Sequence, residues 1–170
     1  MRKNTQKYLA EFVYGATDGV ITTFAIISGV MGAGISPVVI LILGTSNVLA
    51  DGFSMASSNY LSSKSDKAVG NGDGKIPFKT AIVTFVSFVA VGLVPLLPFI
   101  GKALFKKLEF NEFLVSIIFT AAAFIIIGVV RGTVTNKSRT KSSIETILIG
   151  GLAAAIAYFV GHLLRDVAGI

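Results

Sequence analysis

The sequence has no cysteine and few charged residues, and both shortages restrict what the chain does. Without cysteine it forms no disulfide, no thiolate metal site and no cysteine nucleophile. Charged residues make up 14%, against about 25% in a typical soluble domain. Hydrophobic residues reach 53% and the mean hydropathy is +0.79, so the composition indicates an integral membrane protein. The net charge of +6 requires no nucleic-acid partner.

Long apolar runs set the predicted fold. They lie near 12–33, 37–61, 77–100, 113–130 and 144–164, and each is long enough to cross a bilayer as a helix. We therefore predict an all-α protein with a single transmembrane domain of five helices over residues 1–170. A chain of this length has no room for a soluble catalytic domain beside these spans.

The distribution of Lys and Arg predicts the orientation of the five spans. The N-terminal segment and the second and fourth connections carry 11 of these residues, and the other side carries four. Because positively charged loops stay in the cytoplasm, the N-terminus is predicted to be cytoplasmic and the C-terminus outside or in a lumen.

Two aspartates, Asp18 and Asp51, interrupt the first two apolar runs. An ionised carboxylate at membrane depth costs about 2.5 to 3.5 kcal/mol even on lenient insertion scales. A chain keeps such a residue where a partner, a cavity or a permeating cation offsets the cost. Both aspartates are therefore predicted to be functional.

Polar residues continue from these aspartates at helical spacing. In the second run Asn47, Asp51 and Met55 are four residues apart, which places them on one helix face. In the first run the matching face carries Asp18 with two further polar residues, Glu11 and Thr22. At about 1.5 Å per residue, Asp18 and Met55 reach similar depths, each roughly 9 Å from the cytoplasmic end of its run. The two faces predict a path for a solute.

The side chains on these faces suit a metal cation. Carboxylate and amide oxygens bind hard or borderline divalent ions, and the thioether of Met55 favours softer transition metals over Mg²⁺ and Ca²⁺. Iron(II) and manganese(II) fit this mixture. One chain supplies only two intramembrane carboxylates, whereas a twofold homodimer with these faces on its axis would double every ligand.

Small residues at four-residue spacing are weak signals of close helix packing and of oligomerisation. They occur as Gly15 and Gly19 in the first run, Gly128 and Gly132 in the fourth, and Ala153, Ala157 and Gly161 in the fifth.

Four segments of the chain together resemble the vacuolar iron transporter family. They are TDGVITTFAIISGVMGA (17–33), NVLADGFSMASSNYLSSKS (47–65), VGLVPLLPF (91–99) and ETILIGGLAAAIAYFVGHLL (145–164). The resemblance implies a five-helix homodimer that moves Fe²⁺, often also Mn²⁺, out of the cytoplasm in exchange for protons. It also implies that Asp18 and Met55 are metal ligands. Asn47 stands where some relatives have glutamate and Asp51 where those have a small residue, so the acid is displaced by one helical turn.

The interval between the second and third runs departs from the plant members of that family. Those members carry a glutamate-rich metal-gathering segment there, and this sequence has only a short loop over 62–76, predicted to be flexible. Metal capture is then expected to depend on the membrane site itself, with Glu11 at its mouth.

Some of these polar residues and prolines also fit purely structural roles. Met55 also fits plain packing, and Asn47 fits a hydrogen bond between helices. Pro95 and Pro98 are expected to kink the third helix and to provide a hinge rather than to bind anything.

Other functions remain as alternatives to proton-coupled export. A metal-dependent membrane enzyme would need a second acid three or four residues from Asp18 or Asp51, which the sequence lacks. We therefore predict that the chain is no enzyme. An uncoupled divalent cation channel is a further alternative, and a passive scaffold would not need two intramembrane acids. We expect membrane lipid, metal ions and protons as partners, no permanently bound cofactor, and a prokaryotic cell membrane, or a vacuolar membrane in a eukaryote.

Overall fold

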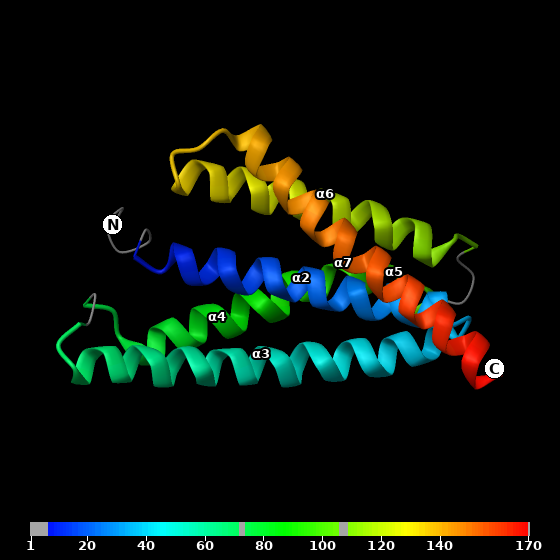
Figure 1. The fold of residues 1–170 in the computed structure, drawn as a ribbon, viewed down its shortest axis with the longest axis horizontal. Helices are drawn as coiled ribbons and strands as arrows, with labels where there is room; N and C mark the ends of the chain where they lie inside the picture. The colour runs from blue at the N-terminus through cyan, green and yellow to red at the C-terminus, as the bar shows by residue number, and fades with distance from the viewer. Residues whose placement is uncertain (1–6, 72–73, 106–108, 170) are drawn as a thin grey trace.

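The protein is an all-helical bundle. The computed structural model describes residues 7–71, 74–105 and 109–169, and in these ranges it contains helices and no strands. The elements are α2 (Leu9–Gly32), α3 (Pro37–Ala68), α4 (Pro77–Gly92), the 3-10 helix η1 (Val94–Leu96), α5 (Leu97–Leu104), α6 (Glu112–Val134) and α7 (Arg139–Ala168). They run along the long axis of the molecule (Figure 1).

Five helical segments are long and apolar enough to span a membrane. They are α2, α3, the combined segment Pro77–Leu104, α6 and α7. The predicted all-α architecture with five spans is confirmed. The 32 residues of α3 extend over about 48 Å at 1.5 Å per residue, which exceeds the roughly 30 Å of a hydrocarbon core. One end of α3 therefore projects beyond the membrane.

That projecting end corrects the prediction of a flexible loop over 62–76. The helix α3 continues through Ser62 to Ala68, and the chain turns only at Gly70, whose φ of +80° suits glycine. The end of an apolar run in the sequence indicates where a helix leaves the hydrocarbon core, not where the helix ends. A helix that has already formed continues into water at little cost in free energy. The connection to α4 is shorter than expected.

The helix α2 lies at the centre of the bundle, in contact with α3, α4, α6 and α7. Glycines permit this close packing. A methyl group on Gly19 would lie 2.5 Å from the carbonyl oxygen of Phe88 in α4, and one on Gly161 would lie 2.1 Å from the carbonyl oxygen of Gly29 in α2. Residues with a side chain at these two positions would push the helices apart.

The same contacts correct the interpretation of the small residues as oligomerisation signals. Gly15 and Gly19 pack against α4 of their own chain, and Gly128 and Gly132 pack against α7. The α7 ridge of Ala153, Ala157 and Gly161 meets α2 through Ala157 and Gly161. These residues join helices within one chain, because small side chains permit close approach wherever the neighbouring helix comes from.

The third span is interrupted in the middle. α4 ends at Gly92, η1 includes Pro95, and Pro98 is the second residue of α5. The regular α-helix is therefore broken at the two prolines, where a kink was predicted. The Ser116 hydroxyl of α6 donates a 2.7 Å hydrogen bond to the Pro95 carbonyl oxygen. A backbone acceptor at this depth needs such a partner because hydrocarbon supplies none. Both prolines are buried in the bundle.

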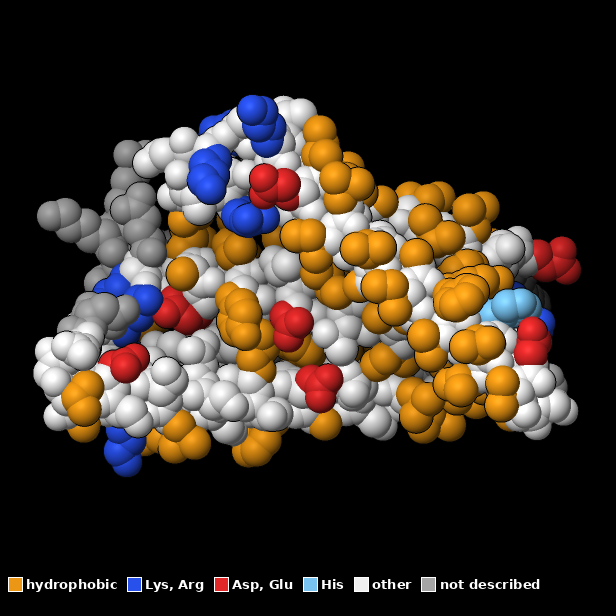
Figure 2. Space-filling model, viewed as in Figure 1, with side chains coloured by type: hydrophobic (Ala, Val, Ile, Leu, Met, Phe, Trp, Pro, Cys, Tyr) orange, Lys and Arg blue, Asp and Glu red, His pale blue; other side chains and the backbone are white. Residues whose placement is uncertain are grey.

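The connections divide between the two ends of the bundle. The start of α2, the α3–α4 connection and the α6–α7 connection share one end, and the C-terminus lies at the other (Figure 1). Lys and Arg side chains gather at the first end (Figure 2). The described ones there are Lys7, Lys64, Lys67, Lys75, Lys79, Arg131, Lys137, Arg139 and Lys141. We call this the basic end.

Candidate functional site

The structure brings the two intramembrane aspartates together. Asp18 of α2 lies close enough to Asp51 of α3 for their carboxylates to interact electrostatically, and the Thr22 side chain interacts with Asp18 from the next turn of α2. Asp18 and Thr22 are four residues apart, so they share one face of the helix. The antiparallel pairing of α2 and α3 thus places these three side chains in one cluster.

Asn47 and Met55 extend this cluster along α3. The Asn47 amide nitrogen Nδ2 donates a 2.6 Å hydrogen bond to Asp51 Oδ2, which holds the carboxylate in a fixed orientation. Met55 follows one turn after Asp51 and is partly exposed on the same side of the helix. Carboxylate oxygens, an amide and a thioether therefore share one side of α3.

The cluster lies at the surface of the chain. Asp18 is exposed and Asp51 is partly exposed, although both lie in membrane-spanning helices. Acidic side chains lie midway along this face among hydrophobic ones (Figure 2). Ionised carboxylates facing hydrocarbon would cost several kcal/mol, on the order of 2.5 to 3.5 each. The face needs a cation, water or protein against it.

A single chain provides too few ligands for a tight metal site. Among the described residues, no group of three or more His, Asp or Glu side chains lies close enough to hold one metal ion. Two carboxylates and one thioether leave most of the coordination sphere of a divalent ion open. The remaining ligands have to come from water or from a second molecule.

Glu11 lies apart from the aspartates, nearer the basic end. It shares a face of α2 with Asp18, from which it is separated by about two turns. Its Oε1 forms a 2.7 Å ion pair with Lys75 Nζ, and its buried Oε2 has no hydrogen-bond partner among the described residues. It lines a cavity of about 590 Å³ with Asn59, Asp66 and several other polar residues. This polar cavity opens between α3 and the α3–α4 connection.

Sequence reasoning missed two residues of this region. Lys75 is separated from Glu11 by 64 positions, and nothing in the sequence pairs them. Asn59 follows Met55 by four residues and so continues the polar spacing of α3, which was a usable signal. Its Nδ2 donates a 2.6 Å hydrogen bond to Thr84 Oγ1 of α4 and thereby joins the two helices.

Comparison with known families gives a match over most of the chain. The model of the VIT family matches residues 9–76 and 69–162. The two parts meet at the connection between α3 and α4. Three of the four segments that carry the sequence resemblance lie within the matched ranges, and the fourth, 145–164, does so up to residue 162.

Individual relatives agree with the family match at low identity. A protein named vacuolar iron transporter from Toxoplasma gondii is 25% identical over 95% of this chain and 76% of its own length. One of the same name from Plasmodium berghei is 24% identical over 95% of this chain and 84% of its own length. Vacuolar iron transporter 1 of Eucalyptus grandis is 22% identical over 87% and 83%, respectively. These relatives are named as transporters, in agreement with the prediction that the chain is no enzyme.

Proposed function

Because this chain belongs to the VIT family, we propose that it transports Fe²⁺, and also Mn²⁺, out of the cytoplasm in exchange for protons. The observation that carries the proposal is the cluster of Asp18 and Asp51 on the exposed face of two membrane-spanning helices. Asn47 orients one carboxylate and Met55 adds a soft ligand one turn away. Thr22 is a polar group beside Asp18 on the same path.

The active unit in this proposal is a homodimer with the aspartate face on its twofold axis. Such a dimer removes Asp18 from hydrocarbon and brings four aspartates and two copies of Met55 around one path. The absence of a three-ligand group within the described part of one chain supports this arrangement. The partner copy completes the site, as the metal is bound between the two chains.

The basic end faces the cytoplasm in this account. Its many Lys and Arg side chains satisfy the positive-inside rule, and the C-terminus then lies outside or in a lumen. Metal enters from the basic end past Glu11, reaches the aspartates and leaves on the opposite side. Pro95 and Pro98, at the break in the third span, provide a hinge for the change between the two open states.

Proton exchange follows from competition for the same oxygens. Metal binds the deprotonated carboxylates, so its binding releases any protons held there. In a dimer, four neighbouring carboxylates repel one another when empty, and either protons or a metal ion relieve that repulsion. If the protonated and metal-bound forms change orientation while the empty ionised form does not, exchange is obligatory.

The connection between α3 and α4 is short in this chain. The alignment with the Toxoplasma protein covers 229 positions, more than the 170 residues of this chain, so that protein carries residues without a counterpart here. The two parts of the family match meet at this connection. Both observations support the absence of a metal-gathering segment, which leaves Glu11 and the membrane site to capture metal from the cytoplasm.

Residues 1–170 act as a single transmembrane domain in a prokaryotic cell membrane, or in a vacuolar membrane if the source is eukaryotic. The metal is the transported substrate and no cofactor is permanently bound.

Uptake into liposomes tests the proposed function. Purified protein is reconstituted, and entry of Fe²⁺, Mn²⁺, Co²⁺, Zn²⁺ and Ca²⁺ is followed with and without a pH gradient. We expect Fe²⁺ and Mn²⁺ to enter faster than Ca²⁺, and faster than in protein-free liposomes. Equal rates for all five ions, unaffected by the gradient, would favour a channel, and no uptake of any ion would contradict metal transport.

A further inference from the structure

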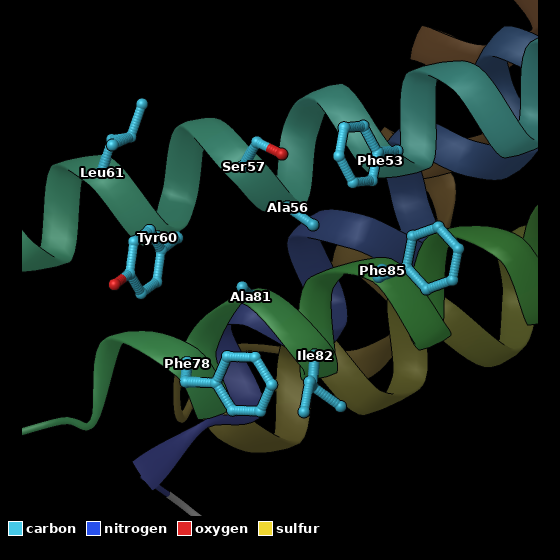
Figure 3. A pocket seen from close by; sticks show the side chains of 9 residues that line it. All are labelled: Phe53, Ala56, Ser57, Tyr60, Leu61, Phe78, Ala81, Ile82 and Phe85. Atoms are coloured by element: carbon cyan, nitrogen blue, oxygen red, sulfur yellow. The ribbon is translucent and has the colours of Figure 1, made fainter.

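An apolar groove runs between α3 and α4 near the basic end. It has a volume of about 620 Å³ and is lined by Phe53, Ala56, Ser57, Tyr60 and Leu61 of α3 and by Phe78, Ala81, Ile82 and Phe85 of α4. Figure 3 shows Tyr60 and Phe78 at one end of the groove and Phe53 and Phe85 at the other. The two alanines, Ala56 and Ala81, lie between these aromatic pairs.

The groove lies on the side of α3 that faces away from the aspartate cluster. Tyr60 comes nine residues after Asp51, which is two and a half turns of an α-helix, so their side chains leave opposite sides. Phe53 comes two residues after Asp51 and is likewise turned away from it. A second copy of the chain on the aspartate face would therefore leave the groove uncovered.

The dimensions of the groove fit one leaflet of a bilayer. From Phe53 to Leu61 it extends over eight residues of α3, or about 12 Å, slightly less than half of a hydrocarbon core of about 30 Å. It begins near the depth of Asp51 and ends close to the polar part of α3. A single acyl chain entering from the basic end fills such a groove along its length.

Two lysines lie near the end of the groove that carries Tyr60 and Phe78. Lys64 is one turn beyond Tyr60, and its Nζ lies over the Tyr60 ring, 5.9 Å from the ring centroid. Lys79 follows Phe78 on the opposite wall and is exposed. Neither lysine has an ion pair among the described residues. Asp66, the acidic residue nearest to Lys64 along α3, lines the separate polar cavity.

We propose that this groove binds an anionic phospholipid, with an acyl chain between α3 and α4 and its phosphate between Lys64 and Lys79. Apolar walls bury the chain, and the two ammonium groups select the negative headgroup. The Tyr60 hydroxyl lies at the boundary between the two parts, where an amphipathic ring is favoured. This site is independent of the metal path and of the proposed transport.

Native mass spectrometry of the full chain tests the site. The protein is presented with phosphatidylglycerol or phosphatidylcholine that carry the same acyl chains, and retained lipid is counted. We expect preferential retention of phosphatidylglycerol. The single variants Lys64→Gln and Lys79→Gln should each reduce that preference by about fivefold, which is the effect of one lysine near an anionic headgroup. Lys141→Gln, an exposed lysine on the α6–α7 side, should leave it unchanged.

A substitution that fills the groove distinguishes lipid binding in the groove from nonspecific lipid binding elsewhere on the protein. Ala81→Trp should remove the retained phosphatidylglycerol, and Ala90→Trp, at an exposed position of α4 outside the groove, should not. Retention by the Ala81→Trp variant would overturn the proposal, as would equal retention of the two lipids by the unmodified chain. Loss of the dimer in that variant would also overturn it, because the groove would then be an interface between copies.

A conservative variant covers the case in which Ala81→Trp does not fold. The chain has no cysteine, so Ser57→Cys provides a single labelling site in the groove for a small fluorophore. Phosphatidylglycerol with brominated acyl chains should quench this label at a lower mole fraction than brominated phosphatidylcholine does. A label at Ile125→Cys, exposed on α6, should show no such difference, and equal quenching at Ser57→Cys would contradict the site.

Discussion

At the residue scale, Asp18 is the side chain on which the proposed transport depends most. It is exposed on a membrane-spanning helix, and it interacts electrostatically with another carboxylate, that of Asp51. No cation of the described part of the chain forms an ion pair with it. In the proposed function, a bound metal ion or proton supplies the missing positive charge. The proposed transport gives this costly intramembrane acid a role as a ligand of the substrate.

Asp18→Asn is predicted to weaken Mn²⁺ binding by at least about tenfold, because the loss of even an outer-shell partner of a metal ligand costs 10- to 100-fold in affinity. Titration calorimetry of the purified variant measures this. Asp166→Asn, at the exposed end of α7, is the matched control and should bind normally. Unchanged binding by the Asp18→Asn variant, with its helical content intact, would remove Asp18 from the site.

Met55→Leu is predicted to change ion selection more than folding. Leucine nearly conserves the volume of methionine but lacks the thioether, so discrimination of Fe²⁺ against Ca²⁺ should fall while stability changes by less than about 1.5 kcal/mol. Competition between the two ions in the liposome assay measures the preference. If the preference is the same in both proteins, Met55 serves only in packing.

At the scale of the helices, glycines at close crossings determine how the bundle packs. Gly161→Ala places a methyl group 2.1 Å from the Gly29 carbonyl oxygen, and a backbone atom moves only with its helix. We predict a loss of about 1 to 3 kcal/mol, the usual range for overpacking. Thermal unfolding in detergent provides the measurement.

Gly151→Ala on the same helix is the control for this prediction. An added methyl group there meets nothing within 4 Å, so the substitution should be neutral or stabilising by up to about 1 kcal/mol. Equal unfolding temperatures for the two variants would show that α7 does not pack on α2 as described.

The five spans were predictable because hydropathy and length alone determine which segments cross a membrane. The continuation of α3 to Ala68 was not, since a helix outside the hydrocarbon leaves no apolar signal. The partners of Gly19 and Gly161 were also hidden, because small residues at four-residue spacing are the same whether the neighbouring helix belongs to the same chain or to another. Only the structure assigns these contacts to α4 and α2.

The polar cluster was predictable to a different extent. The four-residue spacing of Asn47, Asp51 and Met55 gave the side of α3 that carries them, and the structure adds the 2.6 Å bond between the first two. The proximity of Asp18 to Asp51 depends on how α2 and α3 pack against each other, which the spacing within either helix does not give. The ion pair of Glu11 with Lys75 joins distant positions and depends on where the α3–α4 connection folds, which no local pattern gives.

At the scale of the whole molecule, the proposed twofold dimer accounts for the exposed aspartate face. Ser58 is seven residues after Asp51 and therefore lies on the same side of α3, where it is exposed. Because the chain has no cysteine, Ser58→Cys creates a unique thiol near the proposed axis. We predict that a short bifunctional maleimide joins two copies of this variant in membranes.

Ile125→Cys on α6 should not be crosslinked under the same conditions, since that helix lies outside the proposed interface. Denaturing electrophoresis distinguishes the two results. If Ile125→Cys is crosslinked and Ser58→Cys is not, a different surface lies at the dimer axis and Asp18 is left uncovered.

The most direct test of the account measures metal and proton movement together in liposomes with the membrane voltage clamped. We predict that an opposing proton gradient drives Fe²⁺ accumulation and that protons leave as metal enters. Metal affinity should rise with pH, because metal binds the deprotonated carboxylates. Asp18→Asn should abolish both movements. Fe²⁺ accumulation that ignores the proton gradient, or that persists in the Asp18→Asn variant, would contradict exchange at the aspartate cluster.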